Sequence, residues 1–239
     1  GTTTITGGGY VKFNNSPSGG VGSDYEGAVS IDADGEITLK DQNDIQLGTI
    51  TGTGNLTVTA SLGSTGTVTQ SGTITVTKRT TITNTGGDVT LEVEANNLGD
   101  GSASYNSDVV VTAANVSIKN ADTLEVANST VSGTYTVTAI TGDITDSGAL
   151  TIAGTASFQT STADADIVLD VGHAITGKVT LNTTGTGGDA TLDNGTTALV
   201  LGTSAASLAT SVGGNLTLTS GNASGITDAS GETVTVGGN

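Results

Sequence analysis

The feature that most restricts the fold of this chain is a long internal repeat. Residues 37–60 read ITLKDQNDIQLGTITGTGNLTVTA, and residues 116–139 read VSIKNADTLEVANSTVSGTYTVTA. The two segments align without a gap, so that Ile37 meets Val116 and every later position keeps the same shift. Self-similarity at a fixed long period, here about 80 residues, is the signature of a repeat architecture.

The repeat extends over the whole chain. The phrase GNLT at 54–57 recurs as GTYT at 133–136 and as GNLT at 214–217, so its two steps are nearly equal. The chain is therefore expected to be one continuous segment of about three copies. The super-repeats are divided roughly as 1–53 (partial), 54–132, 133–213 and 214–239 (partial).

Each copy contains short runs in which apolar and polar residues alternate. In the run LTVT at 56–59, Leu56 and Val58 are expected to point inward and Thr57 and Thr59 outward, because successive side chains of a strand face opposite sides. Strict alternation of this kind predicts β-strands with one buried face.

Strand-like runs within one copy begin at Ile37, Leu56, Ile74 and Val89. Coils of roughly 15–20 residues, which this spacing indicates, are typical of β-solenoids, whose narrow interior Val, Ile, Leu and Ala can fill. We predict an all-β chain folded as a right-handed parallel β-helix (β-solenoid), built from ~80-residue super-repeats of about four coils each. About 12 coils of roughly 20 residues would make a rod near ~60 Å long.

Two alternatives fit the sequence less well. A string of Ig-like sandwiches matches the repeat length, but sandwich cores need bulky residues and only 3% of residues here are aromatic. Disorder is compatible with 37 glycines and a net charge of −17, but it does not require alternating patterns. Outward loops are expected at 13–23 and 96–106, where Gly, Ser and Asn cluster.

Charge and composition exclude several classes of function. The 6 basic residues are scattered among 23 acidic ones, so we expect no nucleic-acid binding. No apolar run approaches the ~20 residues that span a bilayer, so no membrane insertion is expected. The chain has no cysteine and hence no disulfide framework or thiol chemistry. Its start, GTTT, lacks the basic and apolar regions of a signal peptide, so we expect a mature piece or a fragment of a longer protein.

Carboxylates in alternating positions are the best candidates for catalysis. Such residues lie on one face of a strand and could converge as an acid–base pair. The candidates are Asp164, Asp166 and Asp170, and Asp32, Asp34 and Glu36. We expect them to solubilise corners of the solenoid, and we predict no catalytic residue, no cofactor and no enzymatic activity. His173 is the only histidine, so a transition-metal site is not expected either.

One segment carries ligands suited to calcium. TGGDATLDNG at 186–195 supplies Asp189, Asp193 and Asn194, which are weak candidates for a Ca²⁺ site because calcium prefers carboxylate and amide oxygens. The glycine-rich nonapeptide of calcium β-rolls is absent from the sequence.

Several phrases resemble a known class of repeats. ITDSGALTIAGTASFQTSTADADIVLD at 144–170, TGGDATLDNGTTALVLGT at 186–203 and GNLTLTSGNASGITDASGETVTVGGN at 214–239 are similar to the repeats of filamentous-haemagglutinin-like giant bacterial surface adhesins. The similarity covers roughly residues 29–239. It implies a right-handed β-helix stalk that is extracellular or on the bacterial cell surface, with roles in adhesion, aggregation or biofilm formation.

Three functions remain open at this point. The first is a structural stalk or fibre segment of a secreted or cell-surface adhesin. The second is a self-assembling extracellular filament or sheath subunit that stacks end to end, because a solenoid end exposes unpaired backbone groups. The third is a carbohydrate-binding or carbohydrate-cleaving β-helix protein. The expected partners are identical ends or flanking repeats of the same long chain, together with glycans of host or neighbouring cells.

Overall fold

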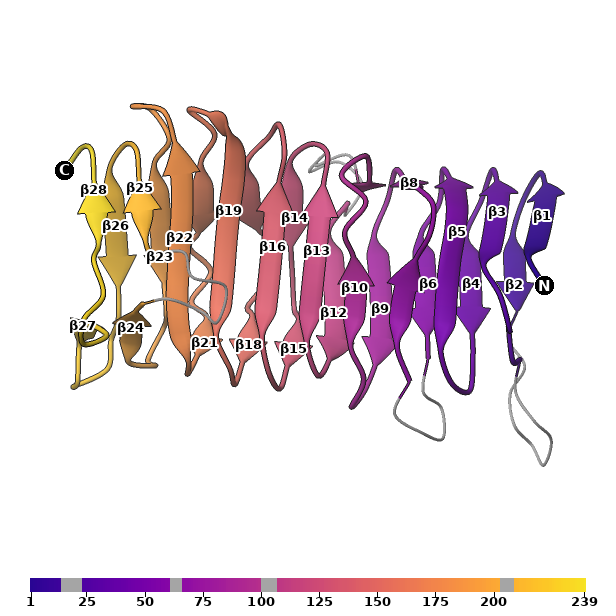
Figure 1. Cartoon of the computed structure of the whole chain (residues 1–239), viewed down its shortest axis with the longest axis horizontal. Coiled ribbons are helices and arrows are strands. Elements are labelled where there is room, and N and C mark those ends of the chain that lie inside the picture. The colour runs from indigo at the N-terminus through magenta and orange to yellow at the C-terminus, as the bar shows by residue number, and fades with distance from the viewer. Residues whose placement is uncertain (14–22, 61–65, 100–106, 203–208) are drawn as a thin grey trace.

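The computed structural model describes residues 1–13, 23–60, 66–99, 107–202 and 209–239. The chain winds as a parallel β-solenoid, and its two termini lie at opposite ends of a rod (Figure 1). Neighbouring strands pair in parallel, and the described residues contain no helix. The all-β solenoid predicted from the sequence is confirmed.

Within the described residues, the strands form two long sheets, here called sheet A and sheet B. Sheet A has 15 strands: β1 (Thr3–Gly7), β3 (Val29–Ala33), β5 (Ile45–Gly52), β7 (Val68–Gln70), β8 (Ile74–Val76), β10 (Val89–Leu91), β11 (Asn97–Leu98), β13 (Val116–Asn120), β16 (Tyr135–Ala139), β19 (Ala156–Ala163), β22 (Lys178–Thr184), β24 (Leu199–Leu201), β25 (Ser211–Val212), β27 (Ile226–Asp228) and β28 (Thr235–Val236). Sheet B has 13 strands: β2 (Val11–Phe13), β4 (Ile37–Lys40), β6 (Leu56–Thr59), β9 (Thr80–Asn84), β12 (Val109–Ala113), β14 (Leu124–Val126), β15 (Thr130–Val131), β17 (Ile144–Asp146), β18 (Thr151–Ile152), β20 (Ile167–Leu169), β21 (Ala174–Ile175), β23 (Ala190–Asp193) and β26 (Leu216–Thr219).

The solenoid has about nine turns, fewer than the ~12 expected. The spacing in sequence between stacked residues is uneven: Val29 stacks on Leu47, whereas Val89 stacks on the more distant Val116. Turns are longer than predicted because many corners carry extra residues that do not belong to the long strands. At ~4.8 Å per turn, nine turns make a rod of about 45 Å.

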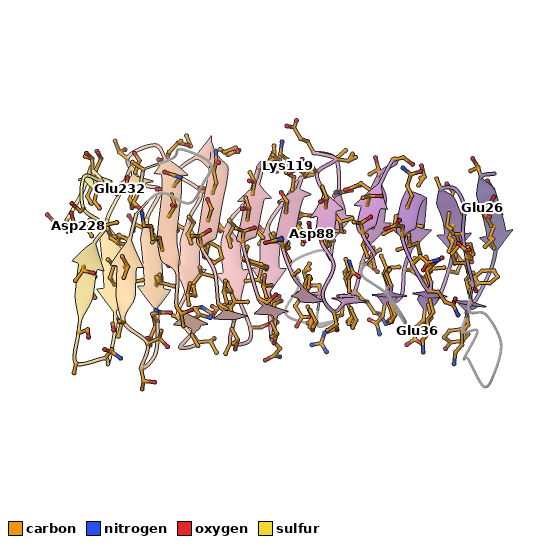
Figure 2. All side chains as sticks on the ribbon, turned by 60° about the horizontal axis from the view of Figure 1, so that its bottom comes forward. Glu26, Glu36, Asp88, Lys119, Asp228 and Glu232 are labelled. Carbon is orange, nitrogen blue, oxygen red and sulfur yellow. The ribbon has the colours of Figure 1, made fainter. Side chains whose placement is uncertain are left out.

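The core is a single column of aliphatic side chains between the two sheets. Leu56 and Val58 are fully buried, while Thr57 and Thr59 are half-buried on the outer face, as the alternation predicted. The same pattern repeats in most strands, so the interior is continuous from Val11 to Val212. Charged side chains project from the outer surface of the rod (Figure 2).

Two aromatic residues enlarge the core at one level. Tyr135 in β16 and Phe158 in β19 are fully buried, with ring centroids 6.0 Å apart and planes tilted by 56°. They fit in successive turns because each stacks beside a smaller residue: Tyr135 pairs with Ala156, and Phe158 pairs with Val137. Alternating large and small side chains keeps the bore at constant width.

Successive super-repeats lie on opposite sheets. Ile37 and Val116 are equivalent in the repeat, yet Ile37 is in β4 of sheet B and Val116 is in β13 of sheet A. The long strands between them alternate sheets in the order β4, β5, β6, β7, β9, β10, β12, β13, which is seven half-turns. A super-repeat is therefore three and a half turns, close to the four expected, and the odd half-turn rotates each copy to the other face.

Two further residues show after how many super-repeats equivalent strands lie in the same sheet again. Leu56 and Leu216 are separated by two super-repeats, and both lie in sheet B, in β6 and β26. Equivalent side chains thus recur on one face of the rod only after two super-repeats, or seven turns.

The prediction of an outward loop at 96–106 is wrong for its first residues. Asn97–Leu98 forms β11 and pairs with β8, and Asn96 is fully buried. The Asn96 side chain accepts the N–H of Ile74 at 3.0 Å, which ties this stretch into the solenoid wall. Residues 100–106, and residues 14–22 of the other expected loop, lie outside the described residues.

Candidate functional site

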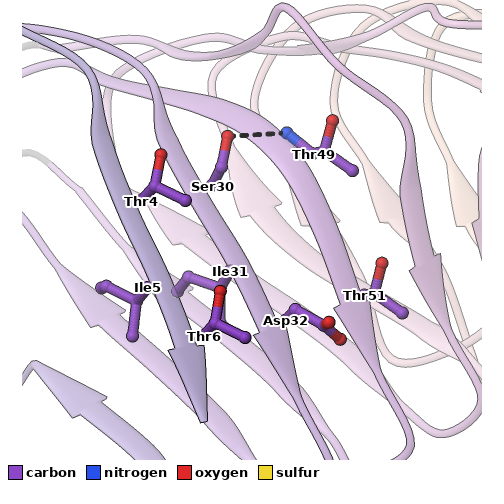
Figure 3. A pocket seen from close by; sticks show the side chains of 8 residues that line it. All are labelled: Thr4, Ile5, Thr6, Ser30, Ile31, Asp32, Thr49 and Thr51. Carbon is purple, nitrogen blue, oxygen red and sulfur yellow. Dashed lines mark hydrogen bonds between the residues drawn. The ribbon is translucent and has the colours of Figure 1, made fainter.

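One hollow on the outer surface lies on sheet A near the N-terminus. It has a volume of about 250 Å³ and crosses β1, β3 and β5 (Figure 3). Two rows of small polar side chains line it, and these are Thr4, Ser30 and Thr49 in one row and Thr6, Asp32 and Thr51 in the other. The hollow is an open groove floored by strands.

A bulge in β5 shapes this groove. Val29 pairs with Leu47 but Ile31 pairs with Ile50, so β5 carries one extra residue at this point. Ser30 Oγ accepts the N–H of Thr49 at 3.1 Å and so replaces a missing backbone partner (Figure 3). Bulges of this kind re-aim side chains locally.

The first set of candidate carboxylates lies beside this groove. Asp32 lines it, and Asp32 and Asp34 both line an adjoining hollow of about 180 Å³. Both carboxylates are exposed, and Glu36 lies in the following corner, where its Oε1 accepts Nδ2–H of Asn55 at 3.5 Å. The three acidic residues share one edge of the rod, but only the first two border a common hollow.

The second set of candidate carboxylates forms hydrogen bonds between successive turns of the solenoid. Asp164 Oδ1 accepts the N–H of Gly187 at 2.8 Å, and Asp166 Oδ1 accepts the N–H of Asp189 at 2.8 Å. Asp170 lies beyond the end of β20 and is exposed, and its backbone N–H donates to the carboxylate of Asp146. Asp164 and Asp166 therefore each fasten one turn to the next.

Asp166 belongs to a ladder of carboxylates at the corner that leads into sheet B. Asp143 Oδ1 accepts the N–H of Asp166, and Asp189 Oδ1 accepts the N–H of Asn215, at 2.8 and 2.6 Å. Asn215 Oδ1 continues the ladder to the N–H of Asn239 at 3.0 Å. Each side chain thus satisfies a backbone donor of the next turn, which explains why acidic residues recur at this corner.

The three calcium candidates are not brought together. Asp189 precedes β23 and Asp193 ends it, so the two carboxylates are separated by the length of the strand, about 13 Å. Asn194 is fully buried: its Oδ1 accepts the N–H of Ile175 at 2.9 Å, and its Nδ2 donates to the carbonyl of Ile175 at 3.0 Å. In the part of the chain that the structure describes, no group of three or more His, Cys, Asp or Glu residues is placed to hold a metal ion.

Buried asparagines are structural residues that the sequence interpretation missed. Asn84, Asn96, Asn120 and Asn194 are all fully buried. Asn120 Oδ1, for example, accepts the N–H of Leu98 at 2.8 Å, and its Nδ2 donates to two carbonyls in the following corner. The signal was present in the runs VSIKN and TLDN, whose final Asn continues the inward positions of a strand.

His173 is also part of the wall of the solenoid. Its side chain is fully buried beside the carboxylate of Asp146, and its Nδ1 accepts the N–H of Leu150 at 3.0 Å. This arrangement keeps the histidine side chain out of contact with solvent.

These features define a parallel β-solenoid repeat protein whose polar side chains mainly join successive turns. A family model described as Repeats of unknown function (DUF5649) matches residues 34–102 and 113–182. The two matches start at residues 34 and 113, and this shift is the one that relates residues 37–60 to residues 116–139 in the sequence. They cover more than half of the chain, and the chain belongs to this family.

No curated protein and no solved structure matches the chain. Among the described residues there is also no helix with the length and apolar character needed to cross a membrane.

Proposed function

We propose that the chain is a structural, non-enzymatic stalk or fibre segment of a secreted or cell-surface adhesin, which acts in adhesion, aggregation or matrix formation. The observation that carries the proposal is the unbroken core. One hydrophobic cluster runs from Val11 to Val212 and includes buried residues of both sheets. Since every turn pairs with the turns beside it, the rod has no internal hinge in its described part.

The outer surface supports the same proposal. The chain carries 23 acidic and 6 basic residues, and a net charge of −17 keeps neighbouring rods apart and soluble. The polar residues that looked most suited to chemistry, Asp164 and Asp166, accept backbone N–H groups and hold turns together. The resemblance of the repeats to giant surface adhesins is the ground for placing the rod outside the cell.

A deletion in phase with the repeat tests whether length is the functional property. Removing residues 54–132 joins Thr53 to Gly133, which is the repeat equivalent of Gly54. The shortened chain should fold and lose three and a half turns, or about 17 Å of length, measured by small-angle X-ray scattering. Removing residues 57–136 is the control, because it joins Leu56 to Val137 within a strand, reverses the alternation of inward and outward positions, and should prevent folding. An in-phase deletion that unfolds the chain or leaves its length unchanged would contradict the proposal.

Display on a bacterial surface then tests the function itself. With a binding module fused after Asn239, the full chain should support attachment to a cognate surface more efficiently than the in-phase deletion, because it reaches farther. The chain without the module should not attach. Turnover of a polysaccharide that Asp164→Asn or Asp166→Asn abolishes would instead favour the carbohydrate-cleaving alternative.

A further inference from the structure

A groove on the outer face of sheet A lies at the level of β7 and β10. It has a volume of about 400 Å³ and is open to solvent, and its lining residues are Thr69, Gln70, Thr90, Glu92 and Val93. This volume falls in the range of ~300–1,000 Å³ that is usual for sites of small ligands. The groove lies well within the rod, since β10 pairs with β7 on one side and with β13 on the other.

The segment between β10 and β11 is longer than the one in the turn before it. Residues 71–73 join β7 to β8, whereas residues 92–96 join β10 to β11. Within the longer segment the N–H of Asn96 donates to the carbonyl of Val93 at 3.0 Å, which closes a turn. Glu92 is exposed and Val93 is half-buried, and both line the groove. The longer segment therefore supplies a charged and an apolar part of the lining.

A pair of side-chain amides holds this segment in place. Nε2 of Gln70 donates to Oδ1 of Asn96 at 2.9 Å, and Nδ2 of Asn96 donates to Oε1 of Gln70 at 2.8 Å. Asn96 is fully buried, and its Oδ1 also accepts the N–H of Ile74. The N–H of Val93 donates to Oε1 of Gln70 at 3.3 Å. Because these bonds fix the segment before a ligand arrives, binding in the groove requires little further ordering.

The lining combines groups of different chemistry. Thr69 of β7 and Thr90 of β10 are the second residues of two paired strands. Their hydroxyls donate and accept hydrogen bonds, whereas the ionised carboxylate of Glu92 only accepts. A ligand that suits all three must carry donors and acceptors close together. The hydroxyl groups of a sugar meet this requirement, and the C–H face of a sugar ring suits the apolar side chain of Val93.

The charges around the groove disfavour ionic ligands of either sign. Glu92 and Glu94 are exposed, and the whole chain has a net charge of −17, so an anionic ligand is repelled. Nζ of Lys119 lies 3.3 Å from Oε1 of Glu94, which offsets one carboxylate and adds a positive charge that disfavours a basic peptide. The groove therefore suits a ligand that is polar and uncharged.

We propose that this groove binds a short stretch of a neutral glycan. The carboxylate of Glu92 accepts hydrogen bonds from sugar hydroxyls, and the hydroxyls of Thr69 and Thr90 complete the polar contacts. The side chain of Val93 packs against a sugar ring.

This site goes beyond the proposed stalk, because it makes the flank of the rod adhesive whatever binding module the rod carries. A rod without the site can still act as a spacer. The length measurement on the in-phase deletion and the binding measurement described next therefore fail independently.

The next copy of the repeat supplies a substitution suited to testing the site. VTQ at 68–70 returns as ITD at 144–146. In that copy Thr145 pairs with Val168, which holds the position of Thr90. Valine therefore fits this position of the fold, so Thr90→Val should remove the hydroxyl and leave the strand intact.

Titration of the ¹⁵N-labelled full chain, followed by NMR, tests the proposal. The probes are neutral hexasaccharides of glucose, mannose, galactose and N-acetylglucosamine, with hexagalacturonate as an anionic probe and hexalysine as a basic one. At least one neutral hexasaccharide should shift the amide signals of Thr69, Thr90, Glu92 and Val93, while those of β9 on the other sheet stay unchanged. No shift with any neutral probe, or binding of hexagalacturonate or hexalysine at these residues instead, would overturn the proposal.

Substitutions in the groove locate the ligand contacts. Thr90→Val should weaken binding about three- to tenfold through the loss of one hydrogen bond, and Glu92→Ala by at least about tenfold through the loss of a charged acceptor. Ser117→Ala is the control for Glu92, because it removes the hydroxyl that donates to Oε1 of Glu92 and keeps the carboxylate. Ser117→Ala, and Thr81→Val on sheet B, should bind as wild type does. Wild-type affinity in Glu92→Ala or Thr90→Val, or equal weakening by Ser117→Ala, would overturn the proposed contacts.

Discussion

The imidazole of His173 faces the carboxylate of Asp146, and solvent reaches neither side chain. Nε2 of His173 lies 3.1 Å from Oδ2 of Asp146, and the two side chains are 0% and 1% exposed. Because Nδ1 accepts the N–H of Leu150, the ring proton is assigned to Nε2, toward the carboxylate. Asp146 also accepts the N–H groups of Asp170 and Val171, at 3.2 and 3.0 Å.

Asp146→Ala should destabilise the rod by about 2 kcal/mol, because it removes the acceptor of two backbone N–H groups and the carboxylate that faces the buried imidazole of His173. The matched control is Asp170→Ala, which removes an exposed carboxylate from the same corner and should change stability by less than about 0.5 kcal/mol. Urea unfolding followed by circular dichroism measures both. Equal midpoints for the two variants would contradict a stabilising role for the buried pair.

Tyr135 should make the rod sensitive to alkaline pH. Burial raises the pKa of its phenol above the ordinary value of 10.0, because the phenolate is disfavoured in the core. A raised pKa in the folded state means that the stability from the neutral phenol is complete below pH 10 and is lost as the pH rises further.

The free energy of unfolding should therefore fall by up to about 1.4 kcal/mol per pH unit above pH 10. Tyr135→Phe should flatten this dependence, whereas Tyr10→Phe should leave it unchanged because Tyr10 is 80% exposed. Urea titrations at pH 9 and 11 compare the three proteins. The same alkaline loss in Tyr135→Phe and wild type would assign the effect to other groups.

The alternation in the sequence was sufficient to predict the strands and the core. It did not reveal that a super-repeat contains an odd number of half-turns and so places successive copies on opposite sheets. Inward and outward positions alternate in the same way in both sheets, so the pattern around Ile37 and Val116 does not show which sheet each belongs to. The short strands that add residues to a turn, such as β15 and β18, have only two residues each and leave no periodic signal.

The candidate site was predicted less well because polar residue types were interpreted as surface residues. Asn194 follows the inward residues Ala190 and Leu192 at a spacing of two, so the alternation itself placed it in the core. The ladder of Asp143, Asp166 and Asp189 depends on how turns of unequal length stack, which the spacing in one sequence does not determine.

Asn194 gives a prediction that separates a structural role from calcium binding. Asn194→Ala should destabilise the rod by about 2 kcal/mol, because the buried N–H of Ile175 loses its acceptor. Asp193→Ala, at the outer position before it, should have a much smaller effect. Neither the urea-unfolding midpoint nor the melting temperature of the protein should change when millimolar Ca²⁺ or a chelator is added. A calcium-dependent rise in melting temperature that Asp189→Ala abolishes would instead support the predicted site.

Arg79 and Asp108 form a bidentate ion pair between successive turns of sheet B. Nη2 of Arg79 lies 2.8 Å from Oδ2 of Asp108, whose side chain is 4% exposed against 38% for Arg79. Arg79→Ala should lower the free energy of unfolding by about 1–3 kcal/mol, less than the loss of a fully buried pair, because solvent reaches the guanidinium. The double variant Arg79→Met, Asp108→Leu should recover most of this loss in urea unfolding. A double variant less stable than Arg79→Ala would show that the pair is not the main interaction.

Gly177 tests how closely the corners of the rod stack. A Cβ atom at Gly177 would overlap the backbone carbonyl of Gly154 in the preceding turn, and one at Gly154 would overlap that of Gly133. The three glycines let successive turns approach at the spacing of a β-ladder, since the N–H of Gly154 donates to the carbonyl of Gly133 at 3.1 Å. Gly177→Ala should therefore destabilise the rod by about 1–3 kcal/mol, because a rigid backbone atom has to move.

Gly7→Ala is the matched control, because a Cβ atom at Gly7 would have no neighbour within 4 Å. It should leave the urea midpoint within experimental error, whereas Gly177→Ala should lower it and speed hydrogen exchange at the amides of β19 and β22. Because each turn contacts only its neighbours, exchange in distant strands such as β4 should stay as in wild type. Equal exchange throughout the rod would mean that the turns unfold together, and equal midpoints for the two variants would show that the corner tolerates a side chain.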